Sequence, residues 1–359
     1  MTLMLTYGAG VISTIKSSSK CHNEVDDTHA NLWGGRGREE IDSLRGNWQA
    51  PVQVRFIENK LVITKYYDPD LQATTGLKAG DIITHINGKT VESIVDSIKE
   101  YYPASNEAAR MRDIANDILR SRNNTISINC ISFNQAKQKD LMLYDRQNTL
   151  LHIYEKDSTL CYRLLNDTIG YITLKSIKKE DIDNIKRNFK NTKGIIIDIR
   201  NYPSYFVPFL LGSYFVSSTT PFVKFSHGNV DNPGEFTFVS PLKIFKPEET
   251  YTYRGKLIVL VNEETQSQAE YTAMAFRAGI NTTIIGSQTA GADGDISNIY
   301  LPGRLSTTIS GIGVYYPDGR ETQRIGIVPD IVVKPTIKGI REGRDELLEK
   351  AIEIINSDK

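Results

Sequence analysis

The most informative stretch of the chain is residues 257–270, which read LIVLVNEETQSQAE. The apolar run at 257–261 predicts a buried strand, and the pattern from Gln268 to Ala278 predicts a helix with Gly279 as its left-handed cap. Similar patterns predict two more strands, at 195–197 and 283–285, and two more helices, at 179–191 and 345–356. Short apolar runs that alternate with helices are typical of a parallel sheet, so the second half of the chain is predicted to be an α/β domain.

Upstream of residue 140 the pattern changes to alternation of apolar and polar residues. Val52 to Phe56 and Leu61 to Ile63 predict a hairpin, and Ile82 to Ile86 predicts a strand that ends in the tight turn Asn87-Gly88. Two helices, at 93–101 and 106–119, and a strand at 125–131 follow. Residues 1–49 are poorly periodic, with a glycine-rich loop at 34–37. We therefore predict an N-terminal segment at 1–49, a small domain at 50–140 and a larger domain at 141–359.

The composition excludes several classes of protein. Among 359 residues, 43 basic and 43 acidic side chains give no net charge, so no global field favours nucleic acid or an anionic membrane. The apolar share of 40% is that of a folded globular protein, and no apolar run approaches the roughly 20 residues of a transmembrane segment. Cys21, Cys130 and Cys161 form no CxxC pair, which argues against a disulfide framework and a zinc knuckle. Residues 1–12 lack the basic residue and the cleavage site of a signal peptide.

Ser267 stands between the predicted strand and the predicted helix. Its hydroxyl would face the unpaired N–H groups at the helix start, where developing negative charge is stabilised. Ser267 and Glu270 also form an S-x-x-E capping box, so the local sequence fits a helix cap as well as a nucleophile. It is not the Gly-x-Ser-x-Gly elbow of the α/β-hydrolases, because Thr265 and Ala269 occupy the glycine positions.

A second pattern lies in the small domain, at residues 76–89. It reads Gly76-Leu77-Lys78-Ala79-Gly80-Asp81-Ile82-Ile83 and closes with Ile86-Asn87-Gly88-Lys89. This pattern resembles the heart of a bacterial PDZ domain. Domains of that family bind extended peptides by adding them as a strand to a sheet edge, so the resemblance implies peptide binding. A well-formed hairpin without that function is the alternative.

Four motifs follow in order: DIRNYP at 198–203, SQAE at 267–270, GSQTAG at 286–291 and GIVPD at 326–330. Their order and spacing resemble the C-terminal processing peptidase and tricorn family of serine peptidases, over about residues 25–335. The resemblance implies a crotonase-like catalytic domain of α/β class with a PDZ-like domain upstream. It also implies Ser267 as the nucleophile and a peptide or protein as the substrate, and it favours an extracytoplasmic location.

The resemblance offers two kinds of general base. Processing peptidases use a lysine in the pattern Thr-x-Gly-Lys-Gly, but Ala292 stands at the lysine position here and cannot accept a proton. The tricorn branch uses a histidine preceded by a hydroxyl residue, and Thr28-His29 resembles that pair. His29 is therefore the predicted base, since an imidazole suits proton transfer at neutral pH. A surface histidine on a polar loop is the alternative.

The resemblance also implies a group that orients the imidazole and a hole for the oxyanion. Family members carry a glutamate three residues before the glycine of GIVPD, where this chain has Gln323. Glu321 would face the same side of an extended segment. For the oxyanion hole we expect the N–H groups of Gln268 and Ser204, although Ser204 stands where the family has glycine. Both departures predict a weaker site.

No motif for a cofactor or a metal is found. The chain has no Gly-x-x-x-x-Gly-Lys-Ser/Thr phosphate loop and no His-Glu-x-x-His pattern. Residues from Asp293 onward begin like a calcium loop, but Asn298 and Arg304 occupy the positions that require glycine and glutamate.

We therefore expect a serine peptidase that cleaves peptides or unfolded protein tails. Ser267 would attack with His29 as base, and Thr28 together with Gln323 or Glu321 would orient the imidazole. The alternative is a non-catalytic peptide-binding scaffold with a disabled cleft, which Gln323 and the missing glycines favour. A third interpretation keeps the hydrolase but assigns it a non-peptide ester or amide.

Overall fold

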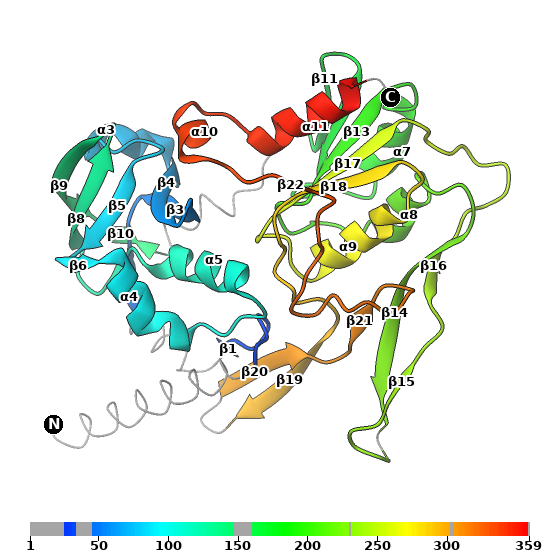
Figure 1. Ribbon diagram of the computed structural model, residues 1–359, viewed down its shortest axis with the longest axis horizontal. Helices are drawn as coiled ribbons and strands as arrows, with labels where there is room; N and C mark the ends of the chain where they lie inside the picture. The colour runs from blue at the N-terminus through cyan, green and yellow to red at the C-terminus, as the bar shows by residue number, and fades with distance from the viewer. Residues whose placement is uncertain (1–24, 34–44, 147–159, 230, 302–304, 358–359) are drawn as a thin grey trace. The chain divides into compact units, whose positions relative to one another are not determined.

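The computed structural model describes residues 25–33, 45–146, 160–229, 231–301 and 305–357. The chain divides into two compact units (Figure 1), and neither unit is one continuous stretch. The first comprises Met1–Glu155, Asn298–Ile309 and Pro335–Asp345, and the second comprises Lys156–Ser297, Ser310–Lys334 and Glu346–Lys359. Outside the described residues lie the predictions made on residues 1–12, on Cys21 and on the glycine-rich loop.

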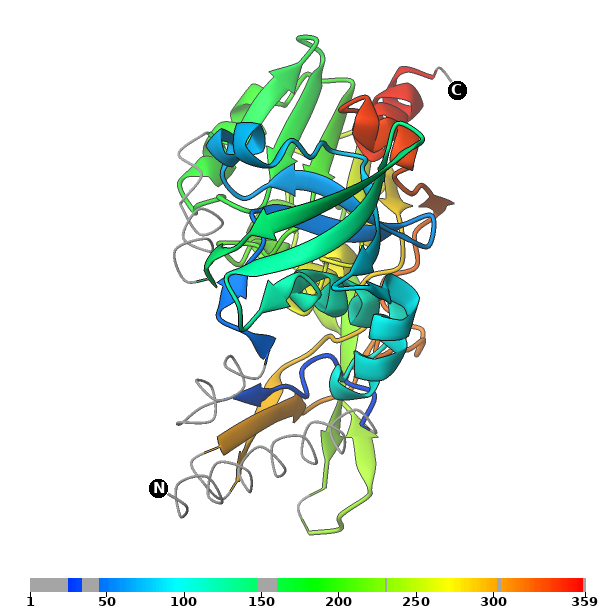
Figure 2. The same ribbon diagram turned by 90° about the vertical axis from the view of Figure 1, so that its left-hand side faces the viewer.

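The first unit is built on an antiparallel sheet with strand order β3-β4-β5-β8-β9 (Figure 2, blue to green). Its strands are β3 (Val52–Ile57), β4 (Lys60–Tyr66), β5 (Ile82–Ile86), β8 (Thr125–Ser132) and β9 (Gln135–Met142), and β6 (Lys89–Thr90) pairs with β5. The predicted hairpin and both predicted strands are confirmed. Asn87 and Gly88 have φ of 47° and 78°, as a tight two-residue turn requires.

Two helices cover the core of this sheet. They are α4 (Val91–Ile98) and α5 (Glu107–Asp117), with the short elements η1 (Pro69–Leu71), α3 (Gln72–Thr75) and η2 (Lys99–Tyr101) nearby in the chain. Asn106 caps α5, because its side chain accepts a hydrogen bond from Ala109 N–H at 3.0 Å. The apolar core of this unit includes the buried residues Leu61, Ile114 and Ile128. Both helices were predicted from the sequence, but the predicted start of α4 lies two residues after the observed one.

Segments from other parts of the chain complete the first unit. β1 (Leu32–Trp33) pairs with β20 (Leu305–Ser310), which pairs with β19 (Ile296–Leu301); β2 (Trp48–Gln49) lies between β7 (Arg120–Ser121) and β10 (Tyr144–Asp145). The helix α10 (Ile337–Arg341) docks on the sheet, since Ile337 N–H donates to the Glu58 carboxylate and Arg341 Nε donates to Gly80 O, both at 3.1 Å.

The second unit is built on the parallel sheet that the apolar runs predict. Its order is β11 (Tyr162–Leu165), β12 (Ile169–Thr173), β13 (Gly194–Asp198), β17 (Lys256–Val261), β18 (Thr282–Gly286) and β22 (Ile331–Val332), with only β11 antiparallel. Helices cover both faces (Figure 1): α11 (Glu346–Asn356) on one, and α7 (Asp181–Asn188), α8 (Pro208–Gly212) and α9 (Gln268–Arg277) on the other. Strands buried on both faces explain the uninterrupted apolar runs.

The predicted left-handed cap at Gly279 is wrong. Ala278 caps α9 with φ −70°, and Gly279 does not have positive φ. The glycine serves close packing instead, because a Cβ there would lie 2.6 Å from Thr282 Oγ1 and 3.0 Å from Phe215 Cβ.

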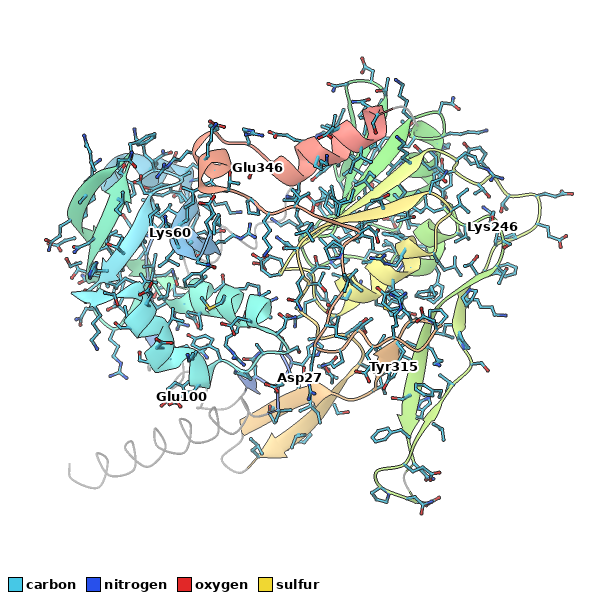
Figure 3. The ribbon with its side chains drawn as sticks, in the orientation of Figure 1. Asp27, Lys60, Glu100, Lys246, Tyr315 and Glu346 are labelled. Atoms are coloured by element: carbon cyan, nitrogen blue, oxygen red, sulfur yellow. The ribbon has the colours of Figure 1, made fainter. Side chains whose placement is uncertain are left out.

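A small second sheet of the same unit was not predicted. It consists of β14 (Thr220–Gly228), β15 (Phe236–Phe238), β16 (Leu242–Ile244) and β21 (Val314–Tyr315). Tyr315 lies on it, and Lys246 follows its strand β16 (Figure 3). The Lys246 ammonium is held by the carbonyls of Ser213 and Tyr251 at 2.9 and 2.7 Å. Among the described residues, no helix combines the length and the apolar character needed to cross a membrane.

Candidate active site

Three loops meet at the carboxyl edge of the parallel sheet. They follow the adjacent strands β13, β17 and β18, and adjacent parallel strands end at the same edge. Thr265 Oγ1, in the second loop, donates to Ile199 O in the first at 2.8 Å. Ala290 N–H, in the third loop, donates to Thr265 O at 3.0 Å. Topology thus gathers the DIRNYP, SQAE and GSQTAG motifs in one place.

Ser267 sits at the start of α9 in an unusual backbone conformation. Its φ is 56° and its ψ is −120°, whereas a normal N-cap has an extended backbone. A non-glycine residue held there costs about 1 to 3 kcal/mol and persists only where its surroundings enforce it. Ser267 N–H has two acceptors, Ala292 O at 2.9 Å and Glu270 Oε2 at 3.1 Å. Helix capping alone therefore does not account for Ser267, and such strain clusters at functional sites.

We expect the Ser267→Gly variant to be more stable than Ser267→Ala by about 1 kcal/mol, because glycine alone adopts this conformation freely. Urea unfolding of the two variants measures the difference. Ser213, with φ −59°, serves as the control position, where alanine should be the more stable replacement. A less stable Ser267→Gly would mean that residue 267 carries no strain.

Glu270 is fully buried beside Ser267. Its Oε1 accepts from Thr289 Oγ1 and from Gly291 N–H at 2.8 Å, and its Oε2 accepts from Ser267 N–H and Ala292 N–H, both at 3.1 Å. Burial raises the pKa of Glu270, and these hydrogen bonds oppose the shift. The sequence indicated Glu270 only as the third residue of a capping box. Its contacts with the GSQTAG loop required the tertiary structure.

Asp293, in the loop after β18, is a second buried carboxyl group near Ser267. Burial and the neighbouring Glu270 charge raise its pKa well above the ordinary 3.8. Its Oδ1 accepts from Gly294 N–H at 2.8 Å, and its Oδ2 lies 3.5 Å from Thr322 Oγ1. Thr322 Oγ1 already donates to Val314 O at 3.0 Å, so a protonated Asp293 can donate to the threonine oxygen. Burial of Asp293 next to Glu270 therefore favours its protonated form.

The predicted base His29 belongs to the first unit. Its side chain is 10% exposed, and its Nδ1 lies 3.8 Å from Asp27 Oδ1, which also accepts a hydrogen bond from His29 N–H at 2.9 Å. Burial lowers the pKa of His29, and the Asp27 charge opposes that shift. Thr308 Oγ1 of β20 donates to His29 O. Asp27 was not predicted as a partner, although it stands two residues before the histidine.

Thr28, predicted to orient the imidazole, anchors its loop to Ser105. Its N–H donates to Ser105 Oγ and its Oγ1 accepts from Ser105 N–H, both at 2.9 Å. Both bonds are buried. This reciprocal pair fixes the backbone on which His29 stands.

Gln323 and Glu321 belong to the second unit and have different environments. Gln323 Oε1 accepts from Asp293 N–H at 3.3 Å, and its Nε2 donates to Ser310 Oγ at 3.1 Å. Glu321 is exposed, and its backbone forms an isolated antiparallel β-bridge with Tyr315. The segment turns at residues 323–325, where Arg324 has φ 67°, so the two side chains do not share one face of an extended strand. Gln323 accepts from Asp293 N–H, and Ser267 N–H donates to the carbonyl of the preceding residue, Ala292.

The two expected oxyanion donors also differ. Gln268 is the first residue of α9, and the first N–H groups of a helix have no acceptor within it. Ser204 N–H donates to Leu174 O at 3.0 Å, and Ser204 Oγ donates to Ile177 O at 2.6 Å. Phe206 stacks on Tyr271 of α9 with 5.8 Å between ring centroids, which places the Ser204 loop beside the start of that helix.

Other motif residues hold the architecture. Asp198 forms an ion pair with Arg200 at 2.6 Å and accepts from Tyr171 at 2.9 Å. Asp330 bonds both Arg277 of α9 and Ile284 N–H of β18 at 2.7 Å. These contacts explain two of the motifs without catalysis. Among the described residues, no group of three potential metal ligands occurs.

Comparison with known proteins shows which peptidases the chain resembles. The model of peptidase family S41 matches residues 168–333. The carboxy-terminal-processing protease of Bartonella bacilliformis is 25% identical over 344 residues, covering 90% of this chain and 70% of that protein. Mature CPAF complexed with lactacystin shares the fold, with a TM-score of 0.68 at 14% identity over 95% of this chain and 88% of that one. A candidate peptidase from Parabacteroides merdae has a TM-score of 0.50 at 24% identity over 57% of this chain and 68% of that one. Residues 168–333 therefore resemble peptidase family S41, and the relatives found over most of the chain are peptidases of the same kind.

Proposed function

We propose that the protein is a serine peptidase that cleaves peptides or unfolded protein tails, with Ser267 as its nucleophile. The observation that carries the proposal is the strained backbone of Ser267 at the start of α9, on the carboxyl edge of the sheet. The match of residues 168–333 to peptidase family S41 supports the reaction class. A helix cap needs no strain, whereas a nucleophile gains from an enforced position.

In the proposed reaction, Ser267 Oγ attacks the scissile carbonyl carbon while His29 takes the hydroxyl proton. The oxyanion receives a hydrogen bond from Gln268 N–H and the positive end of the α9 dipole. The C–N bond then breaks, and the imidazolium returns its proton to the leaving amine. Water, deprotonated by His29, hydrolyses the acyl-enzyme. Ser204 would join the oxyanion hole only by giving up its bond to Leu174 O.

We place Asp27 ahead of Gln323 and Glu321 as the group that steadies the imidazolium. Asp27 carries a carboxylate 3.8 Å from His29 Nδ1, whereas Gln323 is neutral and Glu321 is exposed. In this proposal Thr28 fixes the loop, and Gln323 holds the backbone of Asp293. The base and the nucleophile belong to different units, so the proposal requires the two units to present His29 and Ser267 to the same substrate.

We also propose that residues 50–140 form a PDZ-like module and residues 141–359 a crotonase-like peptidase domain. Support comes from the Gly-Leu-x-x-Gly-Asp motif, in which Gly76 and Gly80 have φ of 60° and 85° and Asp81 accepts from Lys78 N–H at 3.0 Å. Within the described residues, β3 pairs only with β4 and forms one edge of its sheet. An extended peptide could add at such an edge.

The test is covalent labelling with a fluorophosphonate. We expect one label per chain on the wild type, located at Ser267 by peptide mapping, and none on Ser267→Ala. Ser287, the serine of the GSQTAG loop, provides the matched control, because Ser287→Ala should label like the wild type. Equal labelling of the wild type and Ser267→Ala would remove Ser267 from the mechanism. Absence of label from a folded wild type that binds peptide would favour the non-catalytic scaffold.

A further inference from the structure

The hydrogen bonds of Glu270 reach well beyond a helix cap. A capping box accounts for one of its four donors, Ser267 N–H. The other three lie 19 to 22 residues further along, at Thr289, Gly291 and Ala292. The carboxylate therefore joins the start of α9 to the loop after β18.

These bonds close a ring around the strained residue. Ser267 N–H donates to Ala292 O and to Glu270 Oε2, and Ala292 N–H donates to the same Oε2. A strained backbone persists only when its surroundings over-determine it, and here two independent acceptors fix one N–H. The ring leaves residue 267 little freedom to relax.

We propose that Glu270 is a positioning residue for catalysis, whose carboxylate holds the Ser267 backbone in the strained conformation that aims the nucleophile. The inference rests on the proposed function. Only a carboxylate supplies two oxygens that accept without donating. Glutamine has the same shape but keeps only one of these oxygens. Its NH₂ group would therefore face either the N–H groups of Ser267 and Ala292 or the Thr289 hydroxyl and Gly291 N–H. Replacing the carboxylate with an amide should therefore break the two hydrogen bonds that one of its oxygens accepts.

The experiment separates positioning from folding. Glu270→Gln is compared with Glu264→Gln, an exposed glutamate in the loop just before Ser267. Active sites are counted by exhaustive fluorophosphonate titration, and kcat is expressed per titrated site. We expect kcat per site to fall about 10- to 100-fold in Glu270→Gln, because a small misplacement of a reacting atom lowers the rate by about that much. KM should stay nearly unchanged. Glu264→Gln should match the wild type.

A purely structural Glu270 gives a different result. Fewer titratable sites with wild-type kcat per site would overturn the inference, because only the folded fraction would then have changed. Should Glu270→Gln yield no folded protein, Thr289→Val keeps the carboxylate and removes one of its four donors. A several-fold fall in kcat per site supports the inference, and an unchanged value overturns it. A wild type that is folded but neither labels nor turns over substrate refutes the proposed function itself.

Discussion

Alanine at Ser267 or at His29 is expected to lower kcat/KM for peptide hydrolysis by about 10⁴-fold or more, and the double variant is expected to lose no further activity. The reason is that attack by the hydroxyl and transfer of its proton form one step, so neither group helps without the other. The measurement is hydrolysis of an unfolded protein by each single variant and by the double variant. Circular dichroism spectra that match the wild type show that each variant is folded. Losses that multiply in the double variant would show that the two residues act independently, and full activity of His29→Ala would exclude it as base.

The same assignment fixes the pH dependence. His29 accepts a proton only when neutral, and burial lowers its pKa from 6.5. We therefore expect kcat/KM to fall as the pH drops through an inflection below 6.5. The charge of Asp27 opposes the shift, so Asp27→Asn should move the inflection to still lower pH. Asp26→Asn, at the exposed neighbour, should leave it in place. An inflection that moves upward in Asp27→Asn would contradict the pairing.

Asp293→Asn is expected to become increasingly more stable than the wild type as the pH rises. In the folded protein the pKa of Asp293 is well above 3.8, whereas in the unfolded chain it is ordinary. The folded state therefore holds a proton that the unfolded state releases. The contribution of Asp293 to the free energy of unfolding is therefore greatest below about pH 4. Above that pH it falls by about 1.4 kcal/mol per pH unit, up to the folded pKa. Asparagine does not titrate, and it retains an oxygen for Gly294 N–H.

Urea unfolding between pH 5 and pH 8 measures this difference. Over this range the gap between Asp293→Asn and the wild type should widen as the pH rises, until the pH passes the folded pKa of Asp293. Asp295→Asn, at the exposed acid two residues later, should follow the wild-type curve. Parallel curves for Asp293→Asn and the wild type would show that Asp293 is ionised in the folded protein.

The sequence predicts those parts of the fold that depend on local pattern. Alternation and an Asn-Gly turn locate the hairpins of the first unit, and the apolar runs locate β13, β17 and β18, because strands covered on both faces have no polar positions. The strand β9 has no such pattern. It reads QAKQKDLM, with Leu141 as its buried residue, and its eight register pairs with β8 hold it in the sheet. Long-range pairing of this kind leaves no local signal.

The sequence suggests residues for the candidate site but not their geometry. Ser267 is indicated by its place between a strand and a helix, which is a local feature. The loop that bonds Glu270 lies 19 to 22 residues beyond it, and no spacing rule predicts these bonds or the positive φ of Ser267. Gly279 shows the same limit, since a glycine after a helix fits a left-handed cap as well as a close approach.

The helices α10 and α11 follow one another near the end of the chain, yet they complete different units. Ile337 of α10 closes a small cluster with Ile57 and Val62, and Ile355 of α11 covers one face of the parallel sheet. Each interior is therefore completed by a segment that lies far along the chain from most of its partners, so separating residues 337–356 from the rest of the chain would leave both units with part of their interior exposed.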